Sequence, residues 1–308
     1  MATEQTTPLI ERATVSTPHR AAAVYATALD YWALTKPEVN FLILVTTFVA
    51  FHLASSAGAA PAGTAIHTLV GTLLVASGAA TLNQFLERSF DAQMRRTARR
   101  PLAAGKLSPL SALWFGLILS VSGALYLAAL NMLTSLLAVL TLLSYLFLYT
   151  PLKRKTPLCT LVGAFPGAAP PLIGWAAARG RLDPEAWVLF LIVFLWQFPH
   201  FMAIAWMYRA DYLRAGYHVL PRQAWRDRFV IWQSLACSLI LVPVALIPAF
   251  TWDLGAFYSL GAALLSLGFL YFSERFAVHG SNTTARQLLV YSILYLLLLF
   301  TLLVLDTK

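Results

Sequence analysis

The chain has 308 residues, of which 59% are hydrophobic and only 11% are charged, and its formal net charge is +9. A soluble domain of this length does not need so much apolar material for its core, so the composition excludes an ordinary soluble protein and indicates an integral membrane protein. The positive charge does not indicate a nucleic-acid partner, because the Lys and Arg residues are distributed as expected for a membrane protein.

The first 38 residues are polar and mixed, and they include the acids Glu4, Glu11, Asp30 and Glu38. They lack the apolar core of a signal peptide and the acid-poor, Arg-rich character of an organellar transit peptide. We therefore expect residues 1–38 to form a polar cytoplasmic segment and residues 39–308 to form one transmembrane domain. A bacterial inner membrane is the simplest location for such a chain.

Apolar runs of about 20 residues, the length that crosses a bilayer as a helix, recur along the whole domain. The runs show no alternation with a period of two, so they predict helices rather than strands of a membrane barrel. The sequence predicts an all-α bundle with nine spans, at 39–57, 65–86, 109–129, 132–150, 159–178, 186–208, 229–249, 254–273 and 287–305.

The fifth predicted span contains the segment GAFPGAAPPLIG, residues 163–174. Proline removes a backbone donor and its ring disturbs the preceding turn, but neighbouring helices can repair such a defect within the membrane. We therefore expect this span to be kinked or broken.

The positive charges predict the orientation of the bundle. If the N-terminus is cytoplasmic, all of the 22 Lys and Arg residues except Arg179, Arg181 and Lys308 lie in the N-terminal segment or in loops on the cytoplasmic side. The positive-inside rule then places the N-terminus in the cytoplasm and the C-terminus outside. The charged loops on the cytoplasmic side indicate that the functional face is cytoplasmic too.

Three polar side chains stand out at the end of the second predicted span, in NQFLERSFDAQMRRTARRP, residues 83–101. Asn83, Glu87 and Asp91 are spaced i, i+4, i+8, so they share one side of a helix if the span continues. Mg²⁺ prefers oxygen ligands and commonly takes one or two carboxylates together with substrate phosphate oxygens. The stripe is therefore a candidate metal site.

Arginines follow this stripe at positions 95, 96, 99 and 100, and their forked donors suit phosphate. Carboxylates next to arginines are explained if a metal-bound polyphosphate lies between them. The alternative is that these arginines are topology anchors or lipid headgroup contacts, with Glu87 paired to Arg88 or Arg95. On charge alone the two interpretations are equally supported, but a second polar cluster on the same side favours a functional site.

The second cluster is in WQFPHFMAIAWMYRADYLRAGYHVLP, residues 196–221. His200, Tyr208 and Asp211 have spacings that place them on one helical face if the helix continues, with Gln197 one turn before His200. A histidine in an apolar span is normally a packing residue, and a substrate role is the alternative. A third cluster, YTPLKRKT at residues 149–156, adds three cations that could serve as anchors or phosphate contacts.

Asn83, Glu87, Asp91, Met94, Arg96, Thr97, Arg100, Pro101 and Leu102 together form the pattern N-x3-E-x3-D-x2-M-x-R-T-x2-R-P-L. This pattern resembles the first signature of the UbiA superfamily of intramembrane prenyltransferases, and more narrowly that of its haem-farnesylating members. Five further segments in the same order extend the resemblance over most of the chain, namely LTKPEV, YTPLKRKTP, GAAPPLIGWAA, WQFPHFMAIAW and DYLRAGYHVLP.

The resemblance implies nine helices around a central cavity that opens toward the cytoplasm. It implies transfer of farnesyl from farnesyl diphosphate to a vinyl group of haem B, giving haem O, with Mg²⁺ as the only cofactor and both reactants as substrates. A haem A synthase or an oxidase-assembly protein would be a natural partner. Isolated Cys159 and Cys237 are interpreted as packing residues, because they show no metal-ligand spacing.

The resemblance also assigns roles to residues. Asn83, Glu87 and Asp91 would hold Mg²⁺ and diphosphate, and with Asp211 of the second acidic region they form the predicted catalytic set. Arg96, Arg100, Lys153 and Arg154 would bind the diphosphate. On the acceptor side, His200, Gln197 and Tyr208 are the candidate haem contacts.

The sequence departs from the family pattern at two places. Residues 216–221 read GYHVLP where the family is closer to GIPMLP, and Glu38 stands where a basic residue is common. Two alternatives therefore stay open. A UbiA-type enzyme acting on an aromatic acceptor would share the first signature, although an aspartate-rich second motif is missing here. A transporter of an anionic amphiphile would also need cytoplasmic cations, but it would be expected to show two similar halves, which this sequence lacks.

Overall fold

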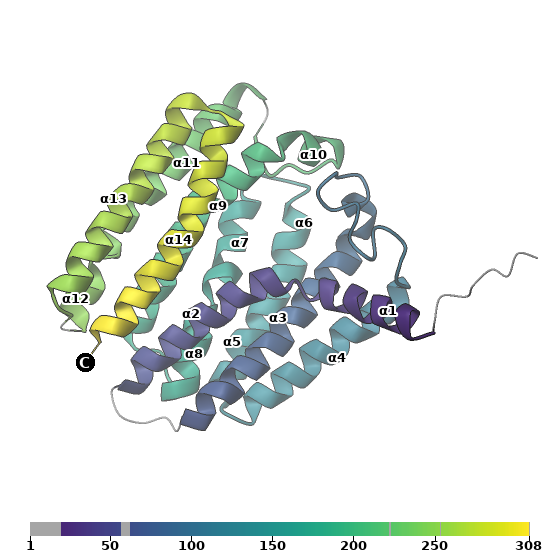
Figure 1. Ribbon diagram of the computed structural model, residues 1–308, viewed down its shortest axis with the longest axis horizontal. Helices are drawn as coiled ribbons and strands as arrows, with labels where there is room; N and C mark the ends of the chain where they lie inside the picture. Colours follow the sequence, from purple (N-terminus) through teal and green to yellow (C-terminus); the bar gives the residue numbers. More distant parts are fainter. Residues whose placement is uncertain (1–19, 57–61, 222, 253, 308) are drawn as a thin grey trace, which may run out of the picture.

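In the computed structural model the residues described are 20–56, 62–221, 223–252 and 254–307, and their regular structure is entirely helical (Figure 1). The elements are α1 (Arg20–Leu34), α2 (Pro37–Ser56), α3 (Ala62–Asp91), α4 (Pro109–Ala128), α5 (Met132–Leu143), the π-helical turn η1 (Ser144–Tyr149), α6 (Thr150–Leu152), α7 (Cys159–Ala168), α8 (Pro170–Arg179), α9 (Pro184–Met207), α10 (Arg209–Arg214), α11 (Gln223–Val244), α12 (Ile247–Thr251), α13 (Ala256–His279) and α14 (Asn282–Asp306).

Within these ranges nine helical stretches are long and apolar enough to cross a membrane, which confirms the predicted spans. The ends differ in a way that matters for the second span. It was predicted over 65–86, but α3 continues to Asp91, about one turn further. The predicted stripe of Asn83, Glu87 and Asp91 therefore lies on one continuous helix.

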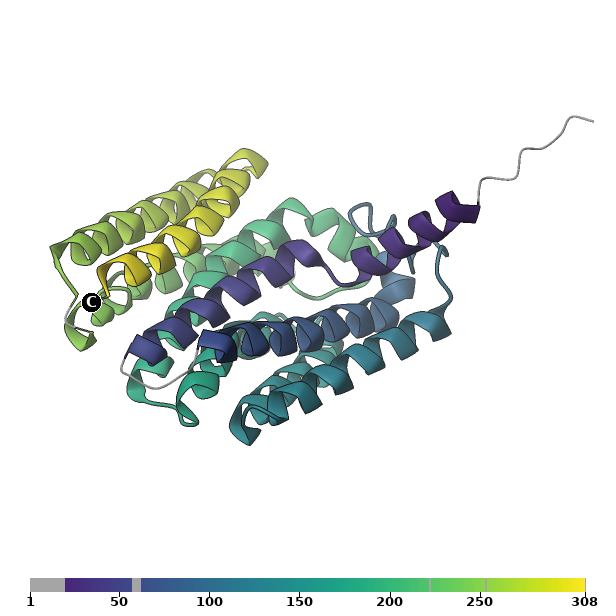
Figure 2. The same cartoon turned by 60° about the horizontal axis from the view of Figure 1, so that its bottom comes forward.

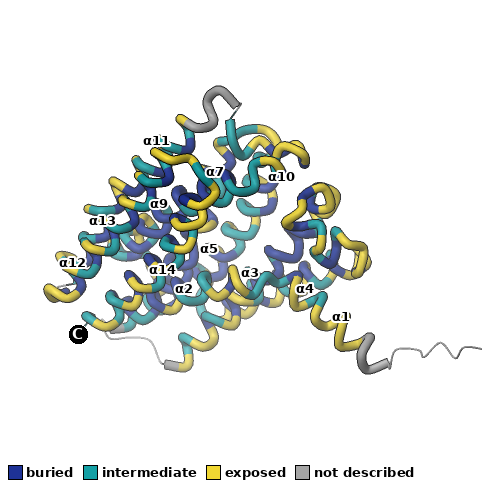
Figure 3. Tube along the Cα trace, turned by 45° about the horizontal axis from the view of Figure 1, so that its top comes forward, coloured by how far each residue is buried: buried dark blue, intermediate teal, exposed yellow. Residues whose placement is uncertain are grey.

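The helices pack as neighbouring antiparallel and crossing pairs. α3 lies along α4, α2 along α8 and α13 along α14, while α9 contacts both α11 and α14 (Figures 1 and 2). The largest apolar core is formed around α9, where Leu189, Ile192 and Met202 have no exposed surface. Figure 3 shows buried residues in the interior of the bundle and exposed ones on its periphery, many of them large and apolar, as expected of a surface in contact with lipid.

The fourth span is not a uniform α-helix. Residues 144–149 form the π-helical turn η1, closed by a hydrogen bond from the backbone N–H of Thr150 to the carbonyl of Tyr145. Pro151 follows directly, and a proline ring collides with the carbonyl four residues before it in an α-helix. The wider turn accommodates this proline and places Thr150 and Lys153 next to α3.

The fifth span is broken, as predicted. α7 ends at Ala168 and α8 begins at Pro170, with Ala169 between them. α8 lies very close to α2, because a Cβ atom on Gly174 would be only 2.9 Å from the carbonyl carbon of Thr47. The proline-rich break therefore lets the second half of the span approach α2.

The N-terminal region contains a helix that the sequence did not predict. Residues 20–34 form α1, and Thr35 and Lys36 connect it to α2. Lys36 has a positive φ of 52°, a conformation that is uncommon for residues with a side chain. This bend divides the segment into two separate helices, α1 and α2, as Figure 2 shows. Residues 1–19 lie outside the described ranges.

Candidate active site

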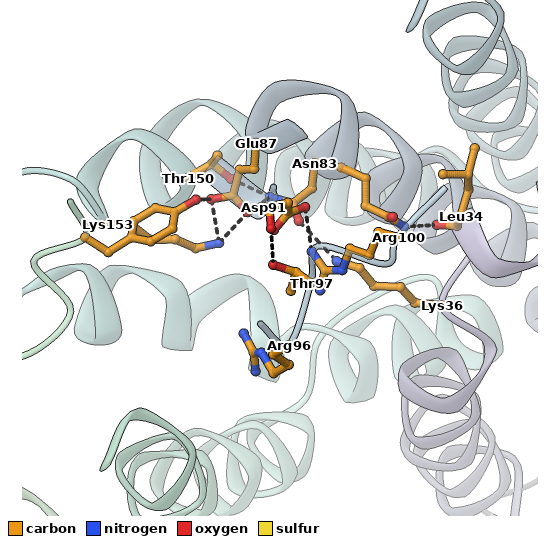
Figure 4. Close-up of polar contacts among 12 residues, drawn as sticks. Leu34, Lys36, Asn83, Glu87, Asp91, Arg96, Thr97, Arg100, Thr150 and Lys153 are labelled. Atoms are coloured by element: carbon orange, nitrogen blue, oxygen red, sulfur yellow. Dashed lines mark hydrogen bonds and ion pairs between the residues drawn. The ribbon is translucent and has the colours of Figure 1, made fainter. Parts of the chain in front are cut away.

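The predicted metal stripe is buried at the end of α3 (Figure 4). Asn83 is 1% exposed, Glu87 6% and Asp91 2%. The amide of Asn83 donates to Oε2 of Glu87 over 2.9 Å and to Oγ1 of Thr150 over 3.3 Å. Burying two acids at a membrane boundary is costly unless cations or donors compensate them. The surrounding side chains provide this compensation.

Glu87 is the most heavily bonded member of the stripe. Nζ of Lys153 lies 2.9 Å from its Oε1 and 3.0 Å from its Oε2, and the hydroxyl of Tyr217 donates to Oε1 over 2.9 Å. Burial alone would lower the pKa of Lys153, but the adjacent Glu87 carboxylate raises that pKa well above its ordinary value. Lys153 therefore carries a full positive charge.

Lys36 is a second cation at this cluster, and its environment differs from that of Lys153. Its Nζ donates over 3.1 Å to Oδ1 of Asn83, a neutral acceptor. Burial, together with the positive charges of Arg100 and Lys153, lowers the pKa of Lys36 from 10.5 to about 7. A buried ammonium without a directly bonded carboxylate is strained electrostatically, and an incoming anion would relieve that strain.

Asp91 is paired with an arginine from the loop that follows α3. The guanidinium of Arg100 lies 2.8 Å from Oδ2 of Asp91, and the hydroxyl of Thr97 donates to the carbonyl of Asp91 over 2.9 Å. The loop therefore folds back onto the end of the helix. Residues that the signature pattern separates by nine positions become direct neighbours.

Arg96 lies apart from the carboxylates in Figure 4 and contacts the second cluster instead. Its backbone N–H donates to Oδ2 of Asp211 over 3.3 Å, and its guanidinium donates to the hydroxyl of Tyr212 over 3.2 Å and lies over the ring of Tyr208. Asp211 also pairs with Arg214 at 3.0 Å. The structure therefore brings together the two polar regions that the sequence analysis singled out, 115 residues apart.

A tight turn after α10 completes this connection. Gly216 has a φ of +69°, which favours glycine because a side chain is disfavoured there. The turn returns Tyr217 toward α3, where it packs with Met94 and Phe90 and reaches Glu87. The backbone N–H of His218 then donates to the carbonyl of Lys153 over 2.6 Å.

The prediction that His200, Tyr208 and Asp211 share one helical face is wrong. α9 ends at Met207, and Tyr208, with φ −105° and ψ 19°, is not helical, so α10 starts in a new direction. Nδ1 of His200 bonds to Oγ of Ser292 on α14 over 2.7 Å. Tyr208 and Asp211 instead contact the loop after α3.

The remaining predicted residues do not form one cluster with each other. Gln197 donates to the carbonyl of Ala164 on α7 over 2.9 Å, so it ties α9 to the broken span. Arg154 lies over the ring of Phe90, with its guanidinium carbon 4.4 Å from the ring centre. Cys159 is fully buried and Cys237 is partly buried.

The oxygen atoms of the stripe fit a magnesium ion that arrives with a polyphosphate. No group of three or more His, Cys, Asp or Glu side chains that could hold a metal occurs among the described residues. Two carboxylates and one amide oxygen are nevertheless a common protein share of a Mg²⁺ site whose other ligands are phosphate oxygens and water. Three basic side chains, Lys36, Arg100 and Lys153, surround the two acids. Arg100 and Lys153 balance the two carboxylates, and a bound anion would favour the charged form of Lys36.

One open groove, of about 600 Å³, lies at the beginning of α11 and is lined by Pro221, Arg228, Phe229, Trp232 and Gln233. None of the predicted site residues lines this groove. The central cavity expected from the resemblance therefore remains a prediction.

Sequence reasoning missed three members of the cluster: Lys36, Thr150 and Tyr217. In the sequence, Lys36 is one of the positive charges that predict the orientation of the bundle, and it stands in the LTKPEV segment directly before a span. Tyr217 was noted only as a departure from the family pattern. Both contact α3 across long stretches of sequence, 47 residues for Lys36 and 130 for Tyr217, so no local periodicity indicated them.

Comparisons with known proteins agree with this geometry. The model of the UbiA prenyltransferase family matches residues 43–298. A protein of Solibacter usitatus named protoheme IX farnesyltransferase is 46% identical over 290 residues, which cover 90% of this chain and 98% of the relative. A protein of the same name from Koribacter versatilis is 41% identical, with 90% and 93% covered.

Solved structures show the same fold at low sequence identity. The structure of a digeranylgeranylglyceryl phosphate synthase superposes with a TM-score of 0.73 at 16% identity, covering 91% of this chain and 98% of that one. A UbiA homolog from Archaeoglobus fulgidus, solved with DMAPP and Mg²⁺ bound, has a TM-score of 0.59 at 13% identity, covering 89% and 99%. With most of its length matched by the family model and by relatives above 40% identity, the chain belongs to the UbiA prenyltransferase family.

Proposed function

We propose that this protein transfers the farnesyl group of farnesyl diphosphate to a vinyl group of haem B and so makes haem O. The observation that carries the proposal is the buried cluster in which Lys36, Arg100 and Lys153 surround Glu87 and Asp91. The names of relatives that match almost end to end supply the acceptor and the prenyl group.

The donor site is the carboxylate stripe with its cations. Asn83, Glu87 and Asp91 would hold Mg²⁺, which when bound neutralises phosphate charge and so makes diphosphate a better leaving group. The side-chain oxygens of this stripe also accept hydrogen bonds from Lys36, Lys153 and Arg100. These three cations would bind the diphosphate directly. Arg96 and Arg154 lie over aromatic rings at the border of the cluster and are candidates for its outer phosphate contacts.

These cations contribute most when the carbon–oxygen bond of the donor breaks. Negative charge then accumulates on the departing diphosphate, so fixed positive groups stabilise the transition state more than the ground state. The farnesyl cation forms a carbon–carbon bond with the terminal vinyl carbon of haem. Water adds to the resulting cation and loses a proton, which yields a hydroxyethylfarnesyl group and free diphosphate. A dry site protects the farnesyl cation from water before the bond forms.

The acceptor would be bound on α9. The bond of His200 to Ser292 uses Nδ1, so Nε2 is the ring nitrogen that could meet haem iron. Gln197 lies one turn earlier on the same helix and Tyr208 lies at its end, next to Arg96. Asp211 accepts a hydrogen bond from the backbone of Arg96, so in this proposal it fixes the position of the acceptor helix relative to the donor site.

The protein crosses the membrane several times, and its relatives are bacterial. We place it in the bacterial inner membrane with the site facing the cytoplasm, because the basic loops lie at the same end as the site. A haem A synthase or an oxidase-assembly protein would then be the partner that receives the apolar product.

The test is an assay of the purified protein in detergent with haem B, farnesyl diphosphate and Mg²⁺. We expect the haem to gain the mass of farnesol, because the farnesyl group and a hydroxyl add across the vinyl group. Chelation of Mg²⁺ and the Asp91→Ala variant should each abolish the product, while the variant keeps its elution volume and thermal stability. Near-normal turnover by Asp91→Ala would refute the metal role.

A control acceptor separates the proposal from its main alternative. If 4-hydroxybenzoate is prenylated and haem is not, the protein is a UbiA-type enzyme for aromatic acceptors and the haem assignment fails. His200→Ala should weaken haem binding, measured by the Soret absorbance, more than it weakens diphosphate binding. Equal losses would show that His200 only packs against α14.

A further inference from the structure

α1 presents an apolar face that no other part of the described chain covers. Val24, Tyr25, Leu29 and Trp32 are 64%, 67%, 47% and 61% exposed. On a helix of 3.6 residues per turn, these residues and Ala28 fall within less than half of the circumference. The charged residue Asp30 lies on the opposite side.

The opposite side of α1 is fixed to the bundle. Leu34 is fully buried against Leu102, Leu107 and Ala112, and its carbonyl accepts from the amide of Gln84 over 2.8 Å. The ring of Tyr31 packs edge-on against Phe115, with 4.9 Å between ring centres. Lys106 reaches Asp30 over 3.5 Å. The orientation of the exposed face is therefore set by contacts on the other side.

These contacts also fix the depth of α1. Ala112 and Phe115 belong to the first two turns of α4, which begins at Pro109 as a membrane span. Leu110 and Trp114, in those same turns, are 63% and 58% exposed and so belong to the lipid-facing surface. α1 therefore packs against the first two turns of a membrane span. α2 enters the membrane only two residues after α1 ends.

We propose that α1 is an interfacial helix whose Val24–Trp32 face rests in the lipid headgroup and upper acyl region, at the end of the bundle that carries the carboxylate cluster. An amphipathic helix in this position buries its apolar face about 5–10 Å into the boundary. Tyr25 and Trp32 are the residue types that concentrate at this depth. The neighbouring loop carries Arg95, Arg99 and Lys106, so the surface that fits is one with anionic lipid headgroups.

The proposal is tested by the environment of single fluorescent labels. Ala28→Cys, within the apolar face, and the matched control Ala26→Cys, about 160° away around the same helix, are made with Cys159 and Cys237 replaced by Ala, labelled and reconstituted in nanodiscs with anionic lipid; both positions are exposed. Quenching is measured with lipids that carry a nitroxide near the carbonyl end of the acyl chain or at its methyl end, and with aqueous iodide.

We expect the shallow nitroxide to quench the label at position 28 more than the deep nitroxide does, and to quench it at least about twofold more than the label at position 26. Iodide should favour position 26. Two outcomes overturn the proposal: a label at 28 that iodide quenches as well as the label at 26, or a label at 28 that is shielded from lipid and iodide alike. The second outcome would mean that a protein covers the face. If the Cys-free background does not fold, the same labels are placed with Cys159 retained, since that residue is fully buried.

Discussion

At the level of single residues, the carboxylate cluster combines two lysines with opposite properties. Lys153 is bonded to both oxygens of Glu87, whereas Lys36 is bonded to an amide and has a pKa of about 7. The first lysine offsets a buried acid and stabilises the fold. The second lysine has no such carboxylate in direct contact, so its interaction energy is available to a bound anion.

Replacing Lys36 should therefore affect the donor substrate specifically. A charged hydrogen bond contributes about 1.5–3 kcal/mol, so Lys36→Met should raise the KM for farnesyl diphosphate about tenfold to a hundredfold. Thermal stability should be unchanged or higher, because a desolvated cation is removed. The matched control is Lys106→Met, which replaces a side chain that is 56% exposed and should leave KM unaltered. Equal effects of the two variants would contradict a role for Lys36 at the diphosphate.

Tyr217 belongs to the segment GYHVLP, where the sequence departs from the family pattern, and it contacts the candidate site. Its hydroxyl donates to Glu87, while its ring packs with Phe90. Tyr217→Phe keeps the ring and removes one hydrogen bond to a charged group, worth about 1.5–3 kcal/mol, so turnover should fall about tenfold to a hundredfold without a change in oligomeric state or elution. Steady-state kinetics with haem B saturating measure this loss. A larger loss of folded protein than of turnover would mean that the bond only stabilises the turn.

At the level of elements, the sequence predicted the spans well because each is a long apolar run, and it predicted the break in the fifth span because Pro166, Pro170 and Pro171 bracket it. It failed at the end of α9. No Gly or Pro lies between His200 and Asp211, so the helical spacing was continued through Tyr208, where the tertiary contacts of Arg96 and Asp211 set a different direction.

For the candidate site too, residues on one helix could be predicted from the sequence, whereas contacts between separate elements could not. Asn83, Glu87 and Asp91 could be predicted together because they are four residues apart on one helix. The contacts of Lys36, Thr150 and Tyr217 join separate elements, and one sequence without homologues contains no periodic signal for such pairs. Composition alone could not reveal α1, because its few apolar residues form one face of a helix of only 15 residues.

The π-helical turn η1 links span four to this site through Thr150. The hydroxyl of Thr150 donates to the carbonyl of Tyr145 over 2.8 Å and accepts from the amide of Asn83 over 3.3 Å. The second bond keeps the amide nitrogen of Asn83 turned away from Lys36, so that its oxygen faces the cations. Thr150 is therefore a positioning residue for Asn83.

Thr150→Val keeps the shape of the side chain and removes its hydroxyl. Because the amide of Asn83 loses one of its two fixed partners, the Mg²⁺ concentration for half-maximal activity should rise about fivefold, which corresponds to about 1 kcal/mol. Thr150→Ser restores the hydroxyl and should restore the Mg²⁺ dependence. A purely structural role would lower thermal stability in both variants and leave the Mg²⁺ requirement of the folded protein unchanged.

At the level of the whole molecule, the proposed donor and acceptor regions are joined by a segment rather than by a single contact. α10 and the turn after it touch the loop after α3 through Asp211 and Tyr212, α3 itself through Tyr217, and Lys153, directly after α6, through His218. α9 leads directly into this segment. Any movement of α9 on binding an acceptor would therefore be transmitted to the groups around Glu87.

The orientation of the whole bundle is the remaining prediction. The described residues contain nine spans, and an odd number puts the two ends of the bundle on opposite sides. The basic residues gather at the end that carries the site, so the positive-inside rule places that end in the cytoplasm. Alkaline phosphatase, which is active only outside the cytoplasm, should therefore be active when fused after Lys308 and inactive when fused after Gly216. Green fluorescent protein at the same positions should give the reverse pattern. Active phosphatase at Gly216 would mean that the bundle has the opposite orientation. The carboxylate cluster would then lie on the wrong side for a cytoplasmic diphosphate.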